Sequence, residues 1–510
     1  MSTATSFSKL GYLLLKKESA AGTAVYPDSP IEILSESIKP NWDFTPVGQI
    51  AGNRSMNSRP ALNKVGPIEG DIELYVEPNT FGHFMNGCFG EDTITTLAAG
   101  VSVQHDWEPG NTLVAYTMDI KMAGEDYVTR YFGVRIKSVK FGIDNNILKA
   151  TISISAQRVF TNARVLTAIG SGTALSVDQT SGLVAGSDTI LVLSNTAPDT
   201  VNATLTVTTV TDETTLVVST IGASLAVDDI VVIKAKTVDT EDYDLTQELI
   251  FSGGAQAYIA NGQDAINNVS AVTNIEDFEL TIENGLEPRW AATGNDVVDR
   301  MPSNILIKGV SVTGAIKKFH ANPEFIDMLR KNEQVGLRLK FLGQLLEANV
   351  AAAASATIET DGAETLSVTV DTAGEAGNDY AIKIVQGTTT LSAALSGKII
   401  TVTLDTDAGD NTTTLVATAI DGLAGVACAS TGTDLVTTTD NPDKINFGSG
   451  RDASEKQALI FDLPNARFQP FWPNLGEDDI VQEDIAFTAY RDADDEREIN
   501  VRLRNDIAGY

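Results

Sequence analysis

Residues 147–158 read ILKATISISAQR, and residues 480–491 read IVQEDIAFTAYR. Both stretches alternate apolar and polar residues, which is typical of a strand with one buried face. The two stretches match at a constant spacing of 333 residues (480 minus 147), so that Ile152 corresponds to Ile485. The pattern predicts one β-rich unit that occurs twice in the chain. A chance alignment of alternating strands is the alternative interpretation.

A second pair of matching stretches lies further upstream. Residues 68–72 read IEGDI and residues 312–316 read VTGAI, a spacing of 244, and Ile38 is matched to Ile282 at the same spacing (282 minus 38). The difference between the two spacings means that the second copy contains about 90 additional residues between these anchors. A domain inserted into the second copy would account for them.

Composition locates the inserted segments. No aromatic residue lies between Phe160 and Tyr243, and only Tyr380 lies between Phe341 and Phe447. Both windows are rich in Thr, Val, Ala, Gly and Asp, which favours small all-β modules. The predicted fold class is mainly β, with two tandem β-sandwich units that each carry a short helix, plus two small β-rich modules. The predicted boundaries are 1–165 (unit 1), 166–236 (the first module), 237–349 with 454–510 (unit 2), and 350–453 (the second module).

The second module is predicted to interrupt a hairpin of unit 2. In unit 1, strands near 117–120 and 127–132 form the hairpin, and in unit 2 the matching strands are 337–341 and 457–461. Loop tips tolerate such insertions because the parent strands stay paired. The pattern of the second module suggests an Ig-like or similar sandwich, with a helix over 412–420 that is capped by Asn411. Helices are also predicted over 81–89 in unit 1 and over 322–331 in unit 2.

The overall charge restricts the class of partner. The 510 residues carry a formal net charge of −32, which argues against ordinary nucleic-acid binding and against attachment to an anionic membrane surface. No apolar stretch is long enough to span a bilayer, and the stretch around Leu10 to Leu15 is no secretory signal. Cys88 and Cys428 are expected to be isolated small side chains, as in a protein that folds in a reducing cytoplasm.

Chemical motifs are scarce in the sequence. His83, His105 and His320 lack metal-ligand spacing, and His83 and His320 are expected to pack beside Phe residues. The acidic run from Asp405 to Asn411 superficially resembles a calcium loop but lacks the required Gly and Glu, so a solvated turn is expected. The sequence therefore predicts no catalytic residue, no cofactor, no metal site and no enzymatic activity.

Several polar segments are candidates for contacts between subunits. Loops 52–55 and 97–106 are expected to reach neighbouring subunits, with ordinary solvated loops as the alternative. The acidic runs 478–479 and 492–498 are expected in an exposed turn or at a ring-contact edge. Four arginines follow or flank these runs and are candidates for ion pairs across a subunit boundary: Arg491, Arg497, Arg502 and Arg504.

Five framework stretches resemble the phage tail tube protein family, also called the major tail proteins. They are 48–55 (GQIAGNRS), 70–72 (GDI), 76–82 (VEPNTFG), 131–136 (YFGVRI) and 275–282 (IEDFELTI). The resemblance covers about 1–160 and 240–510, apart from the inserted module. These stretches belong to the framework rather than to a catalytic site, and the inserted modules depart from the simplest members of the family.

The resemblance implies a structural virion protein whose subunits form stacked rings around a channel for double-stranded DNA during ejection. With two tube units per chain, we expect a trimeric, pseudo-hexameric ring with outward decorating modules and other tail proteins at the ends of the tube. The expected location is the virion tail, after assembly in the host cytoplasm, without contact with a membrane. Bulky outward modules would hinder a sheath, so a non-contractile tail is expected.

Two other classes of function remain open at this point. A surface adhesin or a surface-layer-type binding protein built of small β-sandwiches would have a secretion signal and isolated modules that bind glycans or partners. A glycoside hydrolase would need two carboxylates converging in a cleft, and 68 acidic residues make such a pair impossible to select from sequence. The acidic composition itself has two interpretations: a channel wall that repels phosphate, or solubility of the outer modules.

Overall fold

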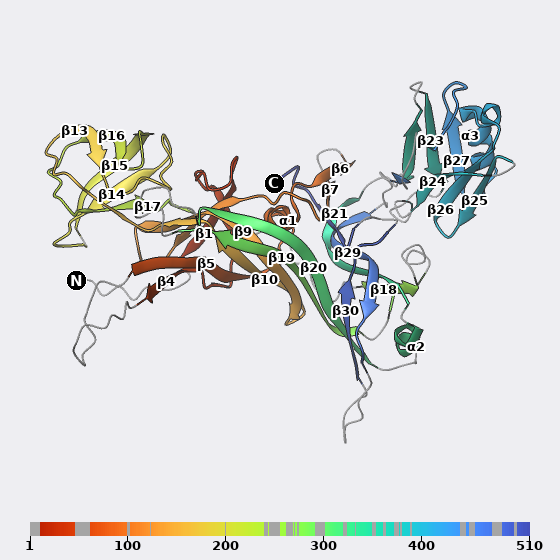
Figure 1. The fold of residues 1–510 in the computed structure, drawn as a ribbon, viewed down its shortest axis with the longest axis horizontal. Helices are drawn as coiled ribbons and strands as arrows, with labels where there is room; N and C mark the ends of the chain where they lie inside the picture. Colours follow the sequence, from red (N-terminus) through yellow and green to blue (C-terminus); the bar gives the residue numbers. More distant parts are fainter. Residues whose placement is uncertain are drawn as a thin grey trace, which may run out of the picture.

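The computed structural model is mainly β, which confirms the predicted fold class (Figure 1). It describes residues 11–45, 62–98, 102–122, 124–198, 200–238, 243, 256–261, 269, 271–272, 275–290, 301–319, 324–331, 333–348, 353–360, 364–371, 377, 380–387, 390–438, 445–447, 454–471, 482–493 and 497–510. Two strand-rich units occupy the centre of the molecule, and the two modules lie at opposite ends (Figure 1).

Unit 1 is built around one long antiparallel sheet in which β4, β5, β10 and β9 lie side by side. The N-terminal half of β9 also pairs with β8, which pairs in turn with β1. Its principal elements are β1 (Tyr12–Lys17), β4 (Lys39–Thr45), β5 (Leu62–Tyr75), α1 (Gly82–Phe89), β8 (Tyr116–Lys121), β9 (Tyr127–Asp144) and β10 (Ile147–Ala156). Smaller strands complete it: β2 (Ser29–Ile31), β3 (Ser35–Glu36), β6 (Thr93–Ala98), β7 (Ser102–Trp107) and β11 (Arg158–Phe160).

Unit 2 repeats this arrangement, with the order β19, β20, β30, β29, β21 and β18 across the sheet. A helix again follows the second strand of that order. The elements are β18 (Gln256–Asn261), β19 (Ile275–Arg289), β20 (Asn304–Phe319), α2 (Glu324–Lys331), β21 (Val335–Ala348), β29 (Ser454–Phe468), β30 (Gln482–Ala489) and β31 (Asn500–Asn505). The order of strands and helix is therefore the same in both units.

The pairing register relates the two units residue by residue. Ile72 of β5 lies opposite Ile152 of β10, and Ile316 of β20 lies opposite Ile485 of β30. Ile72 and Ile316 are 244 positions apart, and Ile152 and Ile485 are 333 positions apart. These are the same spacings that the sequence repeat shows. Because a slip of one residue would turn every side chain to the other face, the match fixes the correspondence between the two sheets.

One predicted correspondence is wrong by two residues. Ile282 lies opposite Val312, the equivalent of Ile68, but the residue opposite Ile68 is Pro40. The counterpart of Ile282 is therefore Pro40 rather than Ile38. The spacing on this strand is 242 (282 minus 40), because Ile282 and Val312 are 30 positions apart (312 minus 282) whereas Pro40 and Ile68 are only 28 apart (68 minus 40).

Gly70 and Gly314 occupy the same position in the two units. A Cβ atom added at Gly70 would lie 2.4 Å from the Ile38 Cα, and one added at Gly314 would lie 2.4 Å from the ring of Phe487. Strand residues that approach a neighbour this closely must be glycine. The repeat therefore preserves a tight contact as well as the apolar alternation.

The apolar faces of both units form a single core. The buried positions of β5 and β10 alternate along each strand, as the sequence pattern predicts for a half-buried strand. The core includes Ile72, Ile152 and Phe141 from unit 1 together with Ile316 and Phe487 from unit 2. The two units are thus fused through their interiors, rather than being two sandwiches with separate cores.

The first module is a small β structure that shares its core with unit 1. Its strands are β12 (Ala163–Arg164), β13 (Gly172–Ser176), β14 (Thr189–Leu193), β15 (Val201–Val210), β16 (Thr215–Ile221) and β17 (Ile230–Lys234). Tyr12, Val128 and Phe132 of unit 1 are buried together with its apolar side chains. Strand β17 also pairs with β9, Ile233 opposite Val128, so this module is continuous with the sheet of unit 1.

The second module lies between β21 and β29, which remain antiparallel neighbours, and it has a core of its own. Its elements are β22 (Ser355–Glu359), β23 (Thr365–Val370), β24 (Ala381–Gln386), β25 (Ser392–Ser396), β26 (Ile399–Leu404), a 3-10 helix (Ala408–Asp410), α3 (Thr413–Asp421), β27 (Val426–Ser430) and β28 (Ile445–Asn446). Strands β24 and β26 are parallel, with Ala381 opposite Ile399. Ig-like sandwiches are antiparallel, so the Ig-like interpretation is wrong.

The predicted helices are present, with small shifts at their ends. Helix α1 begins at Gly82, and α2 is described from Glu324. The predicted cap of α3 is wrong, because Thr412 rather than Asn411 accepts the hydrogen bond from the Leu415 N–H. Asn411 is instead buried in the preceding turn, where its side chain bonds to the backbone of Asp405.

Candidate assembly interface

The two units of one chain are joined edge to edge by backbone pairing. Residues Leu280 to Glu283 of β19 lie antiparallel to β9, with Leu280 opposite Phe141 and Ile282 opposite Val139. The sheets of the two units therefore form one continuous sheet across the junction. An interface of this kind joins two different edges of repeated units, and it can be repeated from unit to unit around a ring.

An aromatic cluster lies beneath the β9–β19 junction. The ring of Phe141 from unit 1 lies 4.8 Å from that of Phe461 of unit 2, in an edge-to-face geometry. Phe81 continues the contact into unit 1, and Phe341 continues it into unit 2. Such ring pairs stabilise an interface beyond the apolar area that they bury.

Asn284 provides the polar counterpart of this cluster. Its side-chain amide donates to the Cys88 carbonyl at 2.9 Å and to the Ile136 carbonyl at 3.2 Å. The Cys88 carbonyl lies at the C-terminal end of α1, where backbone acceptors have no partner within the helix. A side chain of unit 2 thus satisfies two buried acceptors of unit 1.

A second connection is made by β31, which lies between the two units. It pairs with β29 of unit 2 on one side and with β7 of unit 1 on the other. The hairpin of β6 and β7 contains most of the predicted contact loop 97–106. In the described residues, its strand β7 pairs with β31 of the same chain. The contact of this loop with a neighbouring subunit stays a prediction.

The arginines that were expected to form intersubunit ion pairs also have partners within the chain. Arg497 pairs with Glu108 of unit 1, and the Arg504 Nε donates to the Gln104 side chain at 2.8 Å. Arg502 pairs with Asp462 on the neighbouring strand. These contacts cross or flank the boundary between the two units of one chain. Ion pairs across a subunit boundary stay a prediction. Arg491 lies just after the end of β30.

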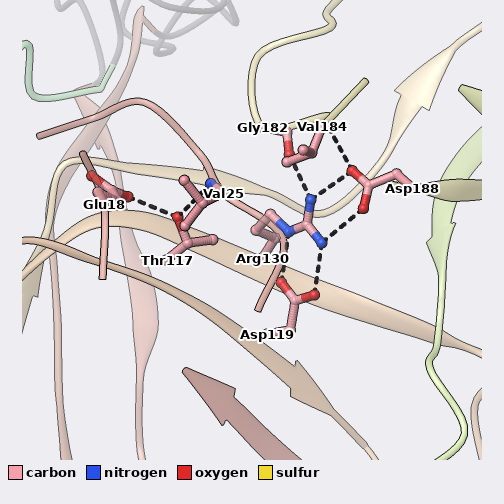
Figure 2. Close-up of polar contacts among 8 residues, drawn as sticks. All are labelled: Glu18, Val25, Thr117, Asp119, Arg130, Gly182, Val184 and Asp188. Carbon is pink, nitrogen blue, oxygen red and sulfur yellow. Dashed lines mark hydrogen bonds and ion pairs between the residues drawn. The ribbon is translucent and has the colours of Figure 1, made fainter. Parts of the chain in front are cut away.

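The first module is fastened to unit 1 by a buried cluster of three charges, which Figure 2 shows. The fully buried Arg130 of β9 donates through Nε and Nη2 to Asp119 of β8, and through both Nη atoms to Asp188 of the first module. A further bond joins it to the Gly182 carbonyl at 3.0 Å. Although burial acts to lower the pKa of Arg130, the two carboxylates raise it above its ordinary value, so the guanidinium stays charged.

Glu18 forms a second buried polar contact in the same part of unit 1 (Figure 2). Its carboxylate accepts hydrogen bonds from the Thr117 hydroxyl and from the Gly133 N–H, each at 2.8 Å. Burial raises the pKa of Glu18, and these hydrogen bonds offset part of the rise. Neither Glu18 nor Arg130 could be identified from the sequence, because a buried charged residue and a solvated one look alike until the fold is known.

Each unit also has an outer edge that corresponds to one side of the β9–β19 junction. In unit 1 this edge is β4, the counterpart of β19, and among the described residues β4 pairs only with β5. In unit 2 it is the segment 469–471 that follows β29 and corresponds to 138–140 of β9. Gln469 of this segment donates to the Ala486 carbonyl of β30 at 2.7 Å, which continues the ladder past the end of β29.

The face of the continuous sheet opposite the core is polar and is called the polar face below. Its middle row consists of residues directly opposite one another on successive strands: Glu73, Thr151, Lys140, Thr281, Thr313, Thr488 and Arg467. Four lysines on or beside this face form ion pairs with its carboxylates: Lys137 with Glu69, Lys140 with Glu279, Lys149 with Glu73, and Lys317 with Asp277. The polar face is therefore rich in hydroxyl groups, and these four lysines are neutralised within the sheet.

Within the part of the chain that the structure describes, the remaining candidate residues form no chemical site. The loop 52–55, the acidic pair 478–479 and His320 lie outside the described residues, as does part of the run 492–498. The side chains of Asp405 and Asp407 accept hydrogen bonds from backbone N–H groups two residues further on, which is the geometry of a turn. His105 bonds to Asp92 and to the Ile507 carbonyl.

The two cysteines and His83 have structural surroundings. Cys88 is buried, Cys428 is half-buried, and both are free thiols. His83 lies against the rings of Tyr116 and Tyr510 in edge-to-face geometry, and burial lowers its pKa to about 4. Within the described ranges, no group of three or more His, Cys, Asp or Glu side chains has the geometry of a metal site.

None of the described helices has both the length and the apolar character needed to cross a membrane. No protein-family model matches the chain, and a search of curated proteins found no match either.

Proposed function

We propose that this chain is a structural virion protein that forms the tail tube of a phage, with stacked rings enclosing a channel for double-stranded DNA. The observation that carries the proposal is the β9–β19 junction: two repeated units join edge to edge into one sheet, and each leaves the complementary edge at its outer side. A heterologous contact that is repeated with a constant rotation closes into a ring. The framework resemblance to tail tube proteins points to the same assembly.

The number of units per chain sets the proposed stoichiometry. Eight strand segments of one chain lie side by side across the junction: β4, β5, β10, β9, β19, β20, β30 and the end of β29. Three chains would supply six units in a pseudo-hexameric ring, with about 24 strands if the outer edges also adjoin (8 times 3). Barrels of roughly 16 strands already leave an aqueous channel, so a ring of this size would have an open bore.

The polar face is the proposed lining of that channel. Its hydroxyl groups and internally paired lysines offer little free positive charge for phosphate, so DNA can pass without the counterion release that drives binding. The modules carry much of the acidity: 7 acidic and 2 basic residues in 166–236, and 14 acidic and 4 basic residues in 350–453. Their net charges of −5 and −10 account for −15 of the total −32, which supports the interpretation of acidity as solubility of the outer modules.

The modules are proposed to decorate the outside of the tube. The first is fixed to unit 1 through Arg130 and strand β17, and the second projects from the β21–β29 hairpin on a core of its own. Bulky outward modules favour a non-contractile tail without a sheath. Other tail proteins are expected at the two ends of the tube.

Electron microscopy and mass measurement test the proposal directly. Purified full-length chain is expected to form rings or tubes in negative stain, with a ring mass of three chains, about 160 kDa from the 54.2 kDa chain. A chain that stays monomeric over a wide range of concentration and salt, with isolated modules that bind glycans, would favour the adhesin alternative instead.

A further inference from the structure

The outer edge of unit 1 has a proline where the intrachain junction has an isoleucine. Pro40 of β4 lies opposite Ile68, and Ile282 of β19 lies opposite Val312. Since Ile68 and Val312 are equivalent in the repeat, Pro40 is the counterpart of Ile282. Ile282 is one of the four β19 residues that pair with β9.

The outer edge of unit 2 has a proline at the matching position. Val139 of β9, the partner of Ile282, lies opposite Ile152 of β10. The equivalent of Ile152 is Ile485 of β30, and the ladder that continues through the Gln469–Ala486 hydrogen bond places Pro470 opposite it. Both members of the central pair in the intrachain junction are thus replaced by proline at the outer edges.

The backbone direction makes these replacements consequential. The Ser37 N–H donates to the Asp71 carbonyl of β5, so by the alternation of an antiparallel ladder the polar groups of Ile38 and Pro40 point to the outer side. Likewise the Gln469 N–H points to β30, so the backbone nitrogen and carbonyl of the next residue, Pro470, point outward. At both edges the position that would donate a ladder hydrogen bond has no N–H.

Two further outward groups near Pro40, the N–H and the carbonyl of Ile38, are already bonded within the chain. The Ile38 N–H donates to the Glu36 carboxylate at 2.9 Å, and the Ile38 carbonyl accepts from the Tyr131 hydroxyl at 3.2 Å. Leu280 is the counterpart of Ile38 in unit 2, and it pairs with Phe141 of β9. The edge of unit 1 therefore has fewer free backbone groups for a neighbouring strand than β19 has at the same positions.

We propose that Pro40 and Pro470 are matched edge blocks, which hold the junction between two copies of this chain weaker than the β9–β19 junction inside each copy. Prolines and satisfied backbone groups are the means by which edge strands avoid uncontrolled addition. The partner is a second copy of the chain, placed in the register of the intrachain junction but lacking its two central hydrogen bonds. The proposal rests on the proposed ring, since it describes how free chains stay apart before that ring closes.

Substitution of both prolines tests the proposal. The variant Pro40→Ile with Pro470→Val restores the residue types of the intrachain junction and both N–H groups. We expect self-association at protein concentrations at least about tenfold lower than for the unmodified chain, measured by sedimentation velocity, because two backbone hydrogen bonds are gained. Each single substitution is expected to have a smaller effect.

A matched control uses a proline in an edge strand away from the junction. Pro30 of β2 lies opposite Leu14 at the other side of unit 1, and Pro30→Val is expected to leave self-association unchanged. Equal association of the double variant and the unmodified chain would overturn the proposal, and so would an equal increase in the control. Circular dichroism and thermal unfolding of each variant identify any failure to fold.

A cysteine pair tests the register independently of the prolines. Lys39 is the counterpart of Thr281, and Phe471 is the counterpart of Lys140, which lies opposite Thr281. In a Cys428→Ser background, Lys39→Cys with Phe471→Cys is expected to give disulfide-linked oligomers on oxidation, because directly opposite strand residues lie within disulfide reach. Rings that form without these disulfides would overturn the register and the edge-block proposal but not the proposed function. A chain that forms no rings under any condition would overturn the proposed function itself.

Discussion

Asn284 and Cys88 are 196 residues apart in sequence, yet the Asn284 amide lies 2.9 Å from the Cys88 carbonyl. The bond joins a strand of unit 2 to the end of a helix in unit 1. Together with the bond to the Ile136 carbonyl, it makes Asn284 the polar centre of the interface between the two units.

Removal of this side chain is expected to destabilise the whole pair of units. Asn284→Ala leaves two buried carbonyls without this donor, and each unsatisfied buried group costs about 1 to 3 kcal/mol. We expect the free energy of unfolding to fall by about 2 to 4 kcal/mol in chemical denaturation. The exposed Asn304→Ala in the same unit is the control, and a loss no greater than in that control would show that the interface does not depend on this bond.

The Arg130 cluster gives a second prediction. Arg130→Gln leaves the carboxylates of Asp119 and Asp188 buried without their common cation, which is expected to destabilise the protein by about 3 to 5 kcal/mol. We also expect faster proteolysis within the first module. Arg164→Gln, which removes an exposed side chain with one long bond to a carbonyl, is the matched control. Unchanged proteolysis of the first module in the Arg130 variant would contradict its role as the fastening.

His83 predicts a pH dependence of stability. Its pKa is about 4 in the folded chain and about 6.5 when unfolded, so between these values the unfolded chain binds more protons. Stability is therefore expected to fall as the pH decreases through this window, by at most about 3 kcal/mol. His83→Phe is expected to flatten that part of the curve of unfolding free energy against pH, relative to the unmodified chain. The same slope in both proteins would mean that other groups cause it.

The polar face provides a prediction about DNA. Thr151→Lys, Thr281→Lys and Thr313→Lys add unpaired positive charge along its middle row. Assembled tubes of this triple variant are expected to retain double-stranded DNA at low salt and to release it as salt increases, because each phosphate contact displaces counterions. Filter binding over a salt series measures this effect.

The control for this experiment places the same charges on the first module. Thr204→Lys, Thr206→Lys and Thr208→Lys alter exposed side chains of β15. If the two triple variants bind DNA equally from inside and outside the tube, net charge alone explains the effect, and the polar face has no special access to DNA.

Local pattern predicted much of the fold. The short strands β14 and β23 lie within the two windows that the sequence predicts as small β modules, because a run of β-branched residues bounded by Gly and Asp is a strong signal for a short strand. The repeat spacings of 244 and 333 agree with the register of β5–β10 and β20–β30. The pattern is informative here because each strand buries one face.

Long-range pairing was less accessible from the sequence. Nothing local to 500–505 indicates that β31 pairs with β7 of unit 1, since the partner of an edge strand depends on the whole fold. The parallel pair β24–β26 was missed for the same reason. Arg497 and Arg504 were identified as pairing residues, but whether a boundary lies within or between chains depends on how the two units are placed.

The position of β31 has a consequence for biosynthesis. The Arg504–Gln104 bond joins residues 400 positions apart, so β7 acquires its neighbour β31 only after that length of chain has followed it from the ribosome. At about 5 to 20 residues per second, that wait lasts roughly 20 to 80 seconds. Until β31 has been synthesised, β7 is an unpaired sheet edge on this side. A nascent chain that is truncated before β31 lacks the strand that pairs with this edge.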